Sequence, residues 1–337
     1  MSAAETRSEP RFVRDRLQGR GERILKSWES LLFVVAVLIF IVNVWSSPYF
    51  LDPWNLSDAT YNFTEKGLIA FALALVIISG EIDLSVASIL ALSSTLMGLA
   101  MSHGAGVPEL VLIGLGTGLV CGAINGVLVS HLGLPSIVVT IGTMSLFRGV
   151  AYIILGDKAF TGCPADFAWF GQGYVWWVFS VELLLFVIAA IVFAVLLHAT
   201  SFGRMVYVIG NNAVAAQFSG VRVERVKFIL FLLSGLMSGV AAICLTSRLG
   251  STRPSIATGW ELEAVTMAVL GGINILGGSG RIGGVVLAAL IMGMVTFGFG
   301  LLNVPGIVMS IFVGLLLILV IAIPKVLKKL APQKKRA

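Results

Sequence analysis

The stretch "FTEKGLIAFALALVIISGEIDLSVASILALSSTLMGLAMS", residues 63–102, decides the fold class of this chain. Two runs of almost pure hydrocarbon, residues 63–80 and 84–102, flank the carboxylates Glu81 and Asp83. Each run comes close to the roughly 20 residues that an α-helix needs to cross a hydrocarbon core of about 30 Å. The stretch therefore predicts two membrane helices joined by a polar break.

The rest of the chain has the same character. Of its 337 residues 58% are hydrophobic and 12% are charged, about half the charged share of an ordinary soluble domain. A soluble fold has too little interior for that much apolar surface, and the alternating pattern of a membrane barrel is missing. The sequence predicts an all-α polytopic membrane protein of about ten transmembrane helices, at residues 29–46, 63–80, 84–102, 108–130, 135–155, 175–197, 227–247, 261–277, 282–302 and 305–323.

The positions of the basic residues predict how the helices are oriented. Seven Lys or Arg precede the first apolar run and six follow Pro324. With the N-terminus inside, 18 of the 23 basic residues lie on the cytoplasmic side, as the positive-inside rule requires. We expect a bacterial inner-membrane protein with cytoplasmic tails at 1–28 and 324–337 around a membrane domain at 29–323. The basic tails then meet anionic lipid headgroups, and no nucleic-acid partner is expected.

Glycines recur at helical spacing in two of the predicted spans. Residues four apart lie along one helix face, where small side chains admit a neighbouring backbone. We therefore expect these glycines to be a packing device. They are Gly114, Gly118, Gly122 and Gly126 in the fourth span, and Gly235 and Gly239 in the seventh.

Four roles are conceivable for Glu81 and Asp83: an acid/base pair, half of a metal site, a substrate contact, or a helix break. Metal binding is disfavoured because His and Cys are missing nearby, and acid catalysis because no nucleophile accompanies the pair. Asp83 is a good N-cap for the next helix, accepting from the amides near Ser85 and Val86. A cap and a polar path lining are compatible if the break lies at membrane depth, where non-helical backbone survives only beside a cavity or packed protein.

Arg148 is the only cation well inside a predicted span. A charge at that depth costs about 2.5–3.5 kcal/mol on insertion scales, so it should face the bundle interior or a carboxylate such as Glu182 or Glu261. Both a path-lining role and a structural ion pair remain open. The candidates for the substrate path are Glu81, Asp83, Ser85, Asn125, Thr140, Arg148, Glu261 and Glu263.

Two motifs occur twice. "GEIDLSVASIL" at residues 80–90 is similar to "GWELEAVTMAVL" at 259–270, and "LPSIVV" at 134–139 to "VPGIVM" at 304–309. Both echoes are five predicted spans apart, and an odd offset reverses the orientation in the membrane. This is the pattern of an inverted-topology repeat, which places a transport path near its pseudo-two-fold axis.

The longest predicted cytoplasmic loop, residues 198–226, is too short for a catalytic domain. In it Asn211 can cap a short helix through Ala213–Ser219 that Gly220 ends. Such a helix is either a docking knob for a soluble partner or an interfacial helix on lipid headgroups. "GSGRIG" at 278–283 matches a dinucleotide-binding glycine pattern, but without a βαβ unit it predicts only a tight turn. We expect no cofactor in this chain.

Four stretches carry a family resemblance: "GEIDLSVAS" (80–88), "LPSIVVTIGTMSLFRGVAYI" (134–153), the loop and helix at 200–235, and "GWELEAVTMAVLGGINILGGSGRIGG" (259–284). In this order they resemble the membrane subunits of ABC-type monosaccharide importers, the ribose-type permease family. The resemblance covers about residues 60–323. Glu81 stands where that family more often has glycine, whereas Asp83 matches.

The resemblance implies a type II importer-like bundle, non-enzymatic, paired with a second permease copy or paralogue. It also implies cytoplasmic ATPase subunits, which bind ATP-Mg, and a periplasmic sugar-binding protein. The substrate is then a pentose, hexose or deoxyhexose, and the overall similarity points to rhamnose or a related sugar. By resemblance, the ATPase-docking residues are Gly203, Arg204, Asn211, Asn212, Ala215, Ala216, Ser219 and Gly220.

Two rival functions remain open. An ion-coupled secondary sugar transporter would use Glu81, Asp83 and Arg148 as coupling groups and would work without ATP. A membrane enzyme acting on lipid-linked sugars would use Glu81 and Asp83 as acid and base. The missing phosphate- or metal-binding cluster argues against the enzyme.

Overall fold

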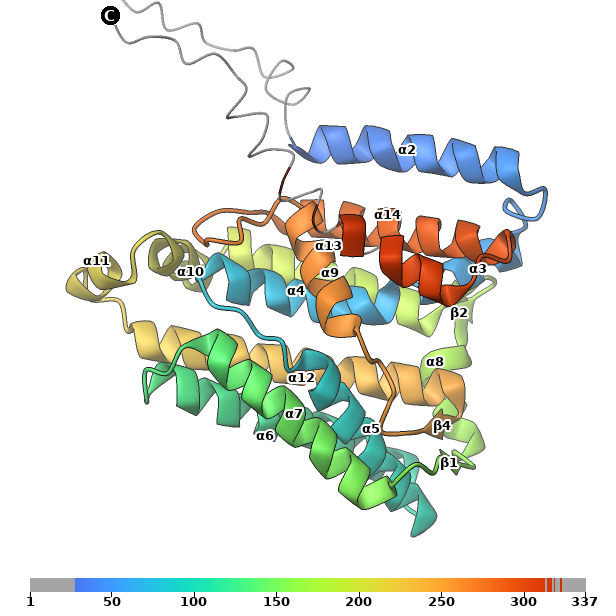
Figure 1. Cartoon of the computed structure of the whole chain (residues 1–337), viewed down its shortest axis with the longest axis horizontal. Coiled ribbons are helices and arrows are strands. Elements are labelled where there is room, and N and C mark those ends of the chain that lie inside the picture. Colours follow the sequence, from blue (N-terminus) through green and yellow to red (C-terminus); the bar gives the residue numbers. More distant parts are fainter. Residues whose placement is uncertain (1–27, 313, 317, 319–321, 323–337) are drawn as a thin grey trace, which may run out of the picture.

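The computed structural model describes residues 28–312, 314–316, 318 and 322, and it is a bundle of helices (Figure 1). The predicted tails at 1–28 and 324–337 therefore lie outside the described residues, apart from Trp28. Among the described residues, six helices are long and apolar enough to cross a membrane. They are α2 (Trp28–Ser46), α6 (Val107–Ser130), α7 (Ser136–Leu155), α9 (Val181–His198), α12 (Val223–Leu249) and α14 (Ile282–Leu301).

The expected count of about ten spans is not confirmed. A seventh span exists only if α3 (Pro53–Tyr61) and α4 (Thr64–Ile78), which meet at a bend of 43°, count as one. The apolar helices α5 (Val86–Ser102) and α13 (Trp260–Leu270) are shorter than a full span. The last predicted span, 305–323, runs beyond the described residues, which include helix between Gly306 and Leu316.

The bundle has two distinct ends (Figure 1). The helical end carries α10 (Ser201–Asn211) and α11 (Ala213–Phe218). The strand end carries η1 (Ala165–Ala168), α8 (Trp169–Gln172) and two short antiparallel pairings. These pair β1 (Phe160–Thr161) with β4 (Ser251–Thr252), and β2 (Tyr174–Trp176) with β3 (Phe179–Ser180).

The strand end corrects one predicted boundary. The span expected at 175–197 begins only at Val181, because residues 174–180 form the β2–β3 hairpin. Ser180 caps the helix, accepting a hydrogen bond of 3.2 Å from the Leu183 amide. The first six residues of the predicted span therefore belong to the strand end.

The packing of α6 against α12 confirms the glycine prediction. A Cβ added to Gly118 would collide with the carbonyl oxygen of Gly235, and one added to Gly235 would collide with that of Gly118. A Cβ on Gly122 would lie 2.6 Å from the carbonyl oxygen of Phe231. The two backbones thus touch along the stripe, and only glycine permits that distance.

Two chain segments enter the bundle from opposite ends as irregular backbone and then become the helices α5 and α13, of 17 and 11 residues (Figure 1). From the helical end, the chain turns at Gly80 (φ 86°) and continues without regular structure to α5. From the strand end, residues 253–259 lead to α13. We call residues 79–85 and 253–259 the first and second re-entrant segments. Non-helical backbone at such depth needs protein partners for its polar groups.

Candidate functional site

The first re-entrant segment is held by a buried polar network around Asp83. Its Oδ1 accepts hydrogen bonds from the Ser85 amide (2.9 Å) and hydroxyl (2.6 Å), and its Oδ2 accepts one from Ser234 Oγ (2.8 Å), near the middle of α12. Asn125 Nδ2 donates to Ser85 Oγ at 2.7 Å. Asp83, Ser85, Asn125 and Ser234 are all fully buried. The network fixes the turn into α5, while Asn125 Oδ1 is buried without a hydrogen-bond partner among the described groups.

Thr140 supports the same segment from α7. Its hydroxyl lies 2.8 Å from Ser136 O within its own helix and 3.3 Å from Ile82 O. The Ile82 amide donates to Ser136 Oγ at 3.2 Å. Four of the eight path candidates are therefore packed interior groups: Asp83, Ser85, Asn125 and Thr140.

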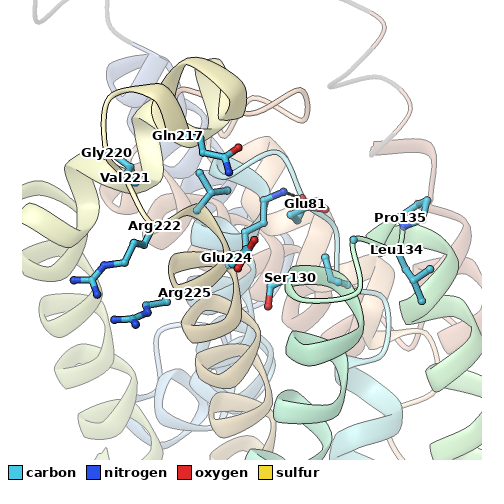
Figure 2. A pocket seen from close by; sticks show the side chains of 14 residues that line it. Glu81, Ser130, Leu134, Pro135, Gln217, Gly220, Val221, Arg222, Glu224 and Arg225 are labelled. Atoms are coloured by element: carbon cyan, nitrogen blue, oxygen red, sulfur yellow. Dashed lines mark hydrogen bonds and ion pairs between the residues drawn. The ribbon is translucent and has the colours of Figure 1, made fainter.

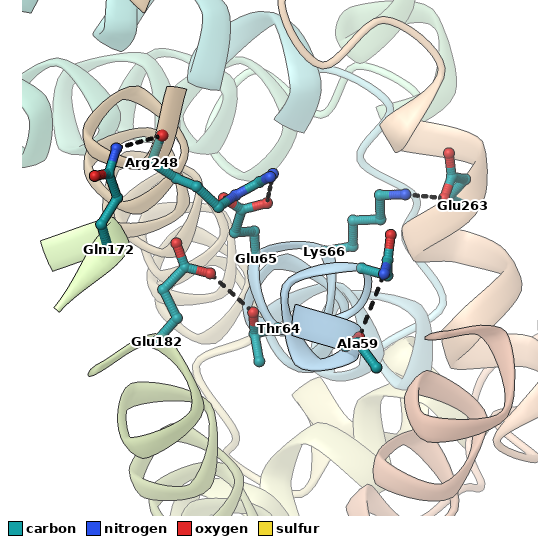
Figure 3. A network of polar contacts seen from close by, with 9 residues as sticks. Ala59, Thr64, Glu65, Lys66, Gln172, Glu182, Arg248 and Glu263 are labelled. Carbon is teal, nitrogen blue, oxygen red and sulfur yellow. Dashed lines mark hydrogen bonds and ion pairs between the residues drawn. The ribbon is translucent and has the colours of Figure 1, made fainter. Parts of the chain in front are cut away.

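The other four candidates are only partly buried, and two of them form ion pairs. Glu81 pairs with Lys227, at the start of α12 and the helical end. Glu263 pairs with Lys66, at the start of α4 and the strand end, at 2.6 Å (Figure 3). The Lys66 ammonium also lies 5.0 Å from the Trp260 ring centroid, a cation–π contact. The sequence analysis identified neither lysine as the partner of these carboxylates, although each lies at the start of a long apolar run.

Arg148 binds backbone and forms no ion pair among the described residues. Its Nη1 donates to the carbonyl oxygens of Pro254 and Ile256, both at 2.8 Å. The predicted partner Glu182 is wrong: it lies at the start of α9 and accepts from Thr64 at 3.0 Å. Glu261 acts on Arg148 only through its charge, and its Oε2 is buried with no partner among the described groups. Arg148 thus positions the second re-entrant segment, as Thr140 supports the first.

A further charged cluster, absent from the predictions, lies at the strand end (Figure 3). Arg248 Nε and Nη2 each donate to a different oxygen of Glu65 at 2.9 Å. Glu65 and Glu182 are fully buried, and Glu182 Oε1 has no partner among the described groups. This bidentate pair joins α4 to α12. No cluster of three metal-ligating side chains occurs among the described residues.

The predicted docking residues lie on α10, α11 and the turn after them. Gly203 and Ala216 are buried, whereas six are exposed: Arg204, Asn211, Asn212, Ala215, Ser219 and Gly220. The predicted short helix exists, but its cap is Asn212 and not Asn211, because Asn212 Oδ1 accepts from the Ala215 amide at 2.9 Å. Asn211 instead ends α10, and its Nδ2 donates to Tyr207 O (2.8 Å) and Gly278 O (3.2 Å).

The α10 helix is tied to the start of the first re-entrant segment, which the sequence reasoning missed. A Cβ on Gly210 would collide with the carbonyl oxygen of Ile78, which also accepts from the Gly278 amide at 2.8 Å. Tyr207 Oη donates to Gly280 O at 2.6 Å. Burial raises the pKa of the Tyr207 hydroxyl, so it remains a neutral donor. Three chain segments thus meet at the helical end.

Beside α11 lies an open cavity of about 740 Å³ (Figure 2). Its walls are the end of α11, the start of α12 and the turn between α6 and α7, and it includes the Glu81–Lys227 pair. Large apolar side chains stand exposed nearby: Phe218 is 90% exposed, Val214 63% and Leu132 63%. Exposed apolar side chains of this size on a protein surface mark contacts with another protein or with the membrane when they form a patch.

Comparisons with known proteins assign this chain to a family. The model of the family described as "branched-chain amino acid transport system / permease component" matches residues 55–321. The chain belongs to this permease family. The matched residues include both re-entrant segments and the α10–α11 segment. They also include the ion pairs Glu81–Lys227 and Glu263–Lys66.

The alignments with individual relatives cover most of each relative and most of this permease. The ribose import permease protein RbsC of Bacillus subtilis is 36% identical over 296 residues, which are 87% of this chain and 90% of RbsC. The autoinducer 2 import system permease protein LsrD of Salmonella typhimurium is 35% identical over 303 residues, 88% of this chain and 90% of LsrD. LsrD of Yersinia enterocolitica is also 35% identical, over 300 residues. No solved structure matches the chain.

These relatives confirm the resemblance to monosaccharide permeases that the sequence motifs indicated. The permease is a multi-pass membrane protein by family and by its apolar helices. Its relatives are permease components, which supports the expectation that the chain itself is not an enzyme.

Proposed function

We propose that this chain is the permease subunit of an ATP-binding-cassette importer that moves a monosaccharide across the bacterial inner membrane. Both termini and the α10–α11 end face the cytoplasm, where ATPase subunits bind α11. The strand end faces the periplasm and receives a sugar-binding protein. The chain changes no bond in its substrate and binds no ATP-Mg itself.

The observation that carries this proposal is the mechanical connection of the docking segment to the membrane interior. The exposed helix α11 follows α10, and α10 contacts Ile78, directly before the first re-entrant segment. Packed interiors transmit displacement because they are dense. A push on α11 by an ATPase therefore reaches residues 79–85.

The arrangement of the two re-entrant segments and the helices that follow them, α5 and α13, supports an inverted repeat of the type II importer kind. Helix α4, the first re-entrant segment and α5 form one unit, and α12, the second re-entrant segment and α13 form the other. The two units enter from opposite ends of the bundle (Figure 1). Transporters of this architecture bind substrate near the midplane, beside such broken helices. We place the sugar path beside α7 and both re-entrant segments, shared with a second permease copy or paralogue.

The substrate follows from the relatives only as a class. Their names specify ribose and autoinducer 2, and the sequence similarity leans towards rhamnose or a related deoxysugar. A neutral sugar needs few polar contacts along the path, because the binding protein can select it. Uptake measured with ribose, rhamnose and autoinducer 2 in parallel assigns the substrate within this class.

The test is ATP-driven sugar uptake into proteoliposomes that hold the complete transporter. The change Phe218→Glu places a charge on the most exposed apolar side chain of α11, and we expect uptake to fall at least tenfold, about 1.4 kcal/mol of lost docking free energy. The matched variant Phe218→Leu keeps an apolar group and should retain most of the uptake. ATPase binding, measured by co-purification, should follow the same order.

Two results would overturn the proposal. Uptake that persists without ATP but with a proton or sodium gradient would identify the ion-coupled alternative. Unchanged ATP-driven uptake and ATPase binding in Phe218→Glu would remove α11 from the docking surface.

A further inference from the structure

Two ion pairs occupy related positions at opposite ends of the bundle. In each, a lysine near the start of one helix binds a carboxylate at or just before the start of a helix that follows a re-entrant segment. Lys227 of α12 binds Glu81 before α5, and Lys66 of α4 binds Glu263 in the first turn of α13. The lysine of each unit thus binds the carboxylate of the other unit.

The sequence echo makes this exchange reciprocal. The stretches at 80–90 and 259–270 each carry two carboxylates around one aliphatic residue. One ion pair uses the first carboxylate of its motif, Glu81, and the other uses the second, Glu263. The two pairs are therefore related in their elements and in their opposite ends of the bundle, but not residue by residue.

Their burial makes these pairs suitable for repeated opening. The side chains of Lys227 and Glu81 are 20% and 14% exposed, and those of Lys66 and Glu263 are 12% and 24% exposed. Each pair is shielded enough to hold, yet water from its own end can hydrate the separated charges. The Arg248–Glu65 pair differs, because Glu65 is fully buried and would lose its bidentate partner.

We propose that Lys227–Glu81 and Lys66–Glu263 are two latches, each of which holds its re-entrant region closed towards its own end of the bundle. The structure has both latches formed. In the transport cycle the cytoplasmic latch, Lys227–Glu81, opens while the periplasmic latch, Lys66–Glu263, stays closed. In another step the periplasmic latch opens while the cytoplasmic latch stays closed. Lys66 and Lys227 are positioning residues in this scheme and need no contact with sugar. The assignment to cycle steps rests on the proposed importer function.

The test uses one buried reporter cysteine per end, in a Cys163→Ser background, because Cys163 is partly accessible while Cys121 and Cys244 are buried. The reporters are Ser79→Cys, two residues before Glu81, and Ala264→Cys, next to Glu263; both native residues are buried. Labelling by a membrane-impermeant maleimide is followed in right-side-out and inside-out vesicles. Each reporter is combined with Lys227→Gln, with Lys66→Gln and with the control Arg248→Gln.

We expect Lys227→Gln to raise labelling of Ser79→Cys from the cytoplasmic side about fivefold or more, the low end of typical coupling between sites. Labelling of Ala264→Cys should stay unchanged in that variant. Lys66→Gln should do the opposite, from the periplasmic side. The charge-swapped pairs Lys227→Glu with Glu81→Lys, and Lys66→Glu with Glu263→Lys, should return labelling towards the starting level.

A general loosening of the bundle has a different signature. Arg248→Gln, which leaves a buried carboxylate unpaired, should raise both reporters together or reduce the amount of folded protein. If the lysine variants behave like this control, or if neither reporter responds, the latches are refuted. The labelling needs no ATP, so the latches stand or fall there even if the complete transporter shows no ATP-driven uptake, which would refute the importer function instead.

Discussion

At the scale of single residues, Asp83 shows how hydrogen bonds can hold a buried carboxylate in a membrane bundle. Its two oxygens accept three hydrogen bonds, two from Ser85 and one from Ser234. The interior thereby offers donors that water would otherwise supply, which is the condition for a buried charge. Its role in this geometry is to fix the turn from the first re-entrant segment into α5.

This role predicts different outcomes for two substitutions of Asp83. Asp83→Ala leaves the Ser85 amide and two hydroxyls without their acceptor and should destabilise the protein by about 2 kcal/mol or more. Asp83→Asn keeps one oxygen for Ser85 and offers an amide donor to the Ser234 hydroxyl, so it should lose less than half as much. Thermal unfolding in detergent, followed by fluorescence, measures both.

Transport provides the contrasting outcome for the same pair of variants. If Asp83→Asn is as stable as the wild type but abolishes uptake, the charge itself is needed and the structural role is insufficient. Retained uptake in Asp83→Asn agrees with a turn-fixing role.

At the scale of elements, the contact between α6 and α12 depends on glycine. The stripe brings the backbone of one helix against that of the other, from Gly114 beside Ile243 to Gly126 beside Phe228. In lipid there is no hydrophobic driving force between helices, so close van der Waals contact of this kind supplies the association. Helix α12 is also the helix that carries Ser234, Lys227 and Arg248, so its position fixes three polar contacts at once.

Two glycines of α6 provide a matched comparison. Gly118→Ala places a methyl group against the backbone of Gly235, where no side chain can move aside, and should cost about 1–3 kcal/mol. Gly116→Ala, half a turn away, meets nothing within 4 Å and should be neutral or slightly stabilising. Equal unfolding temperatures for the two variants would contradict the backbone contact.

At the scale of the whole molecule, a short series of packed elements connects the exposed helix α11 to the interior of the bundle. Helix α11 follows α10, α10 touches the end of α4 at Ile78, and Ile78 directly precedes the first re-entrant segment. The segment ends at the Asp83 network and carries the Glu81–Lys227 pair. A movement of α11 therefore has a short path of packed groups to follow.

Gly210 is the residue of α10 that lies against the backbone of Ile78 in this series of contacts. Gly210→Ala forces α10 away from the carbonyl oxygen of Ile78, and we expect the complete transporter to hydrolyse ATP while uptake per ATP falls several-fold. Gly283→Ala, at the same end of the bundle, meets nothing within 4 Å and serves as the control. A Gly210→Ala variant with unchanged uptake per ATP would show that coupling runs elsewhere.

The membrane class, the glycine stripes and the short helix at 213–218 could be predicted from the sequence. So could the six long helices, five of them to within four residues at either end, whereas α9 begins six residues later than expected. These features depend on local composition and spacing, because a span, a small-residue face and a cap are each defined within about 20 residues. The similarity between the carboxylate motifs at 80–90 and 259–270 could also be found in the sequence, although their function could not be predicted from it. The family motifs lay in the same continuous stretches.

The partners of the polar groups, in contrast, depend on packing between segments that are distant in the chain. Nothing near Glu81 in the chain points to Lys227, nothing near Glu263 points to Lys66, and Arg148 binds carbonyl groups instead of a carboxylate. Helix α5 matches the span expected at 84–102 to within two residues, whereas the span expected at 261–277 holds only the 11-residue helix α13. The irregular backbone before each of these helices is satisfied by partners from other helices. Such partners are distant in sequence, and composition carries no record of which distant groups the packing brings together.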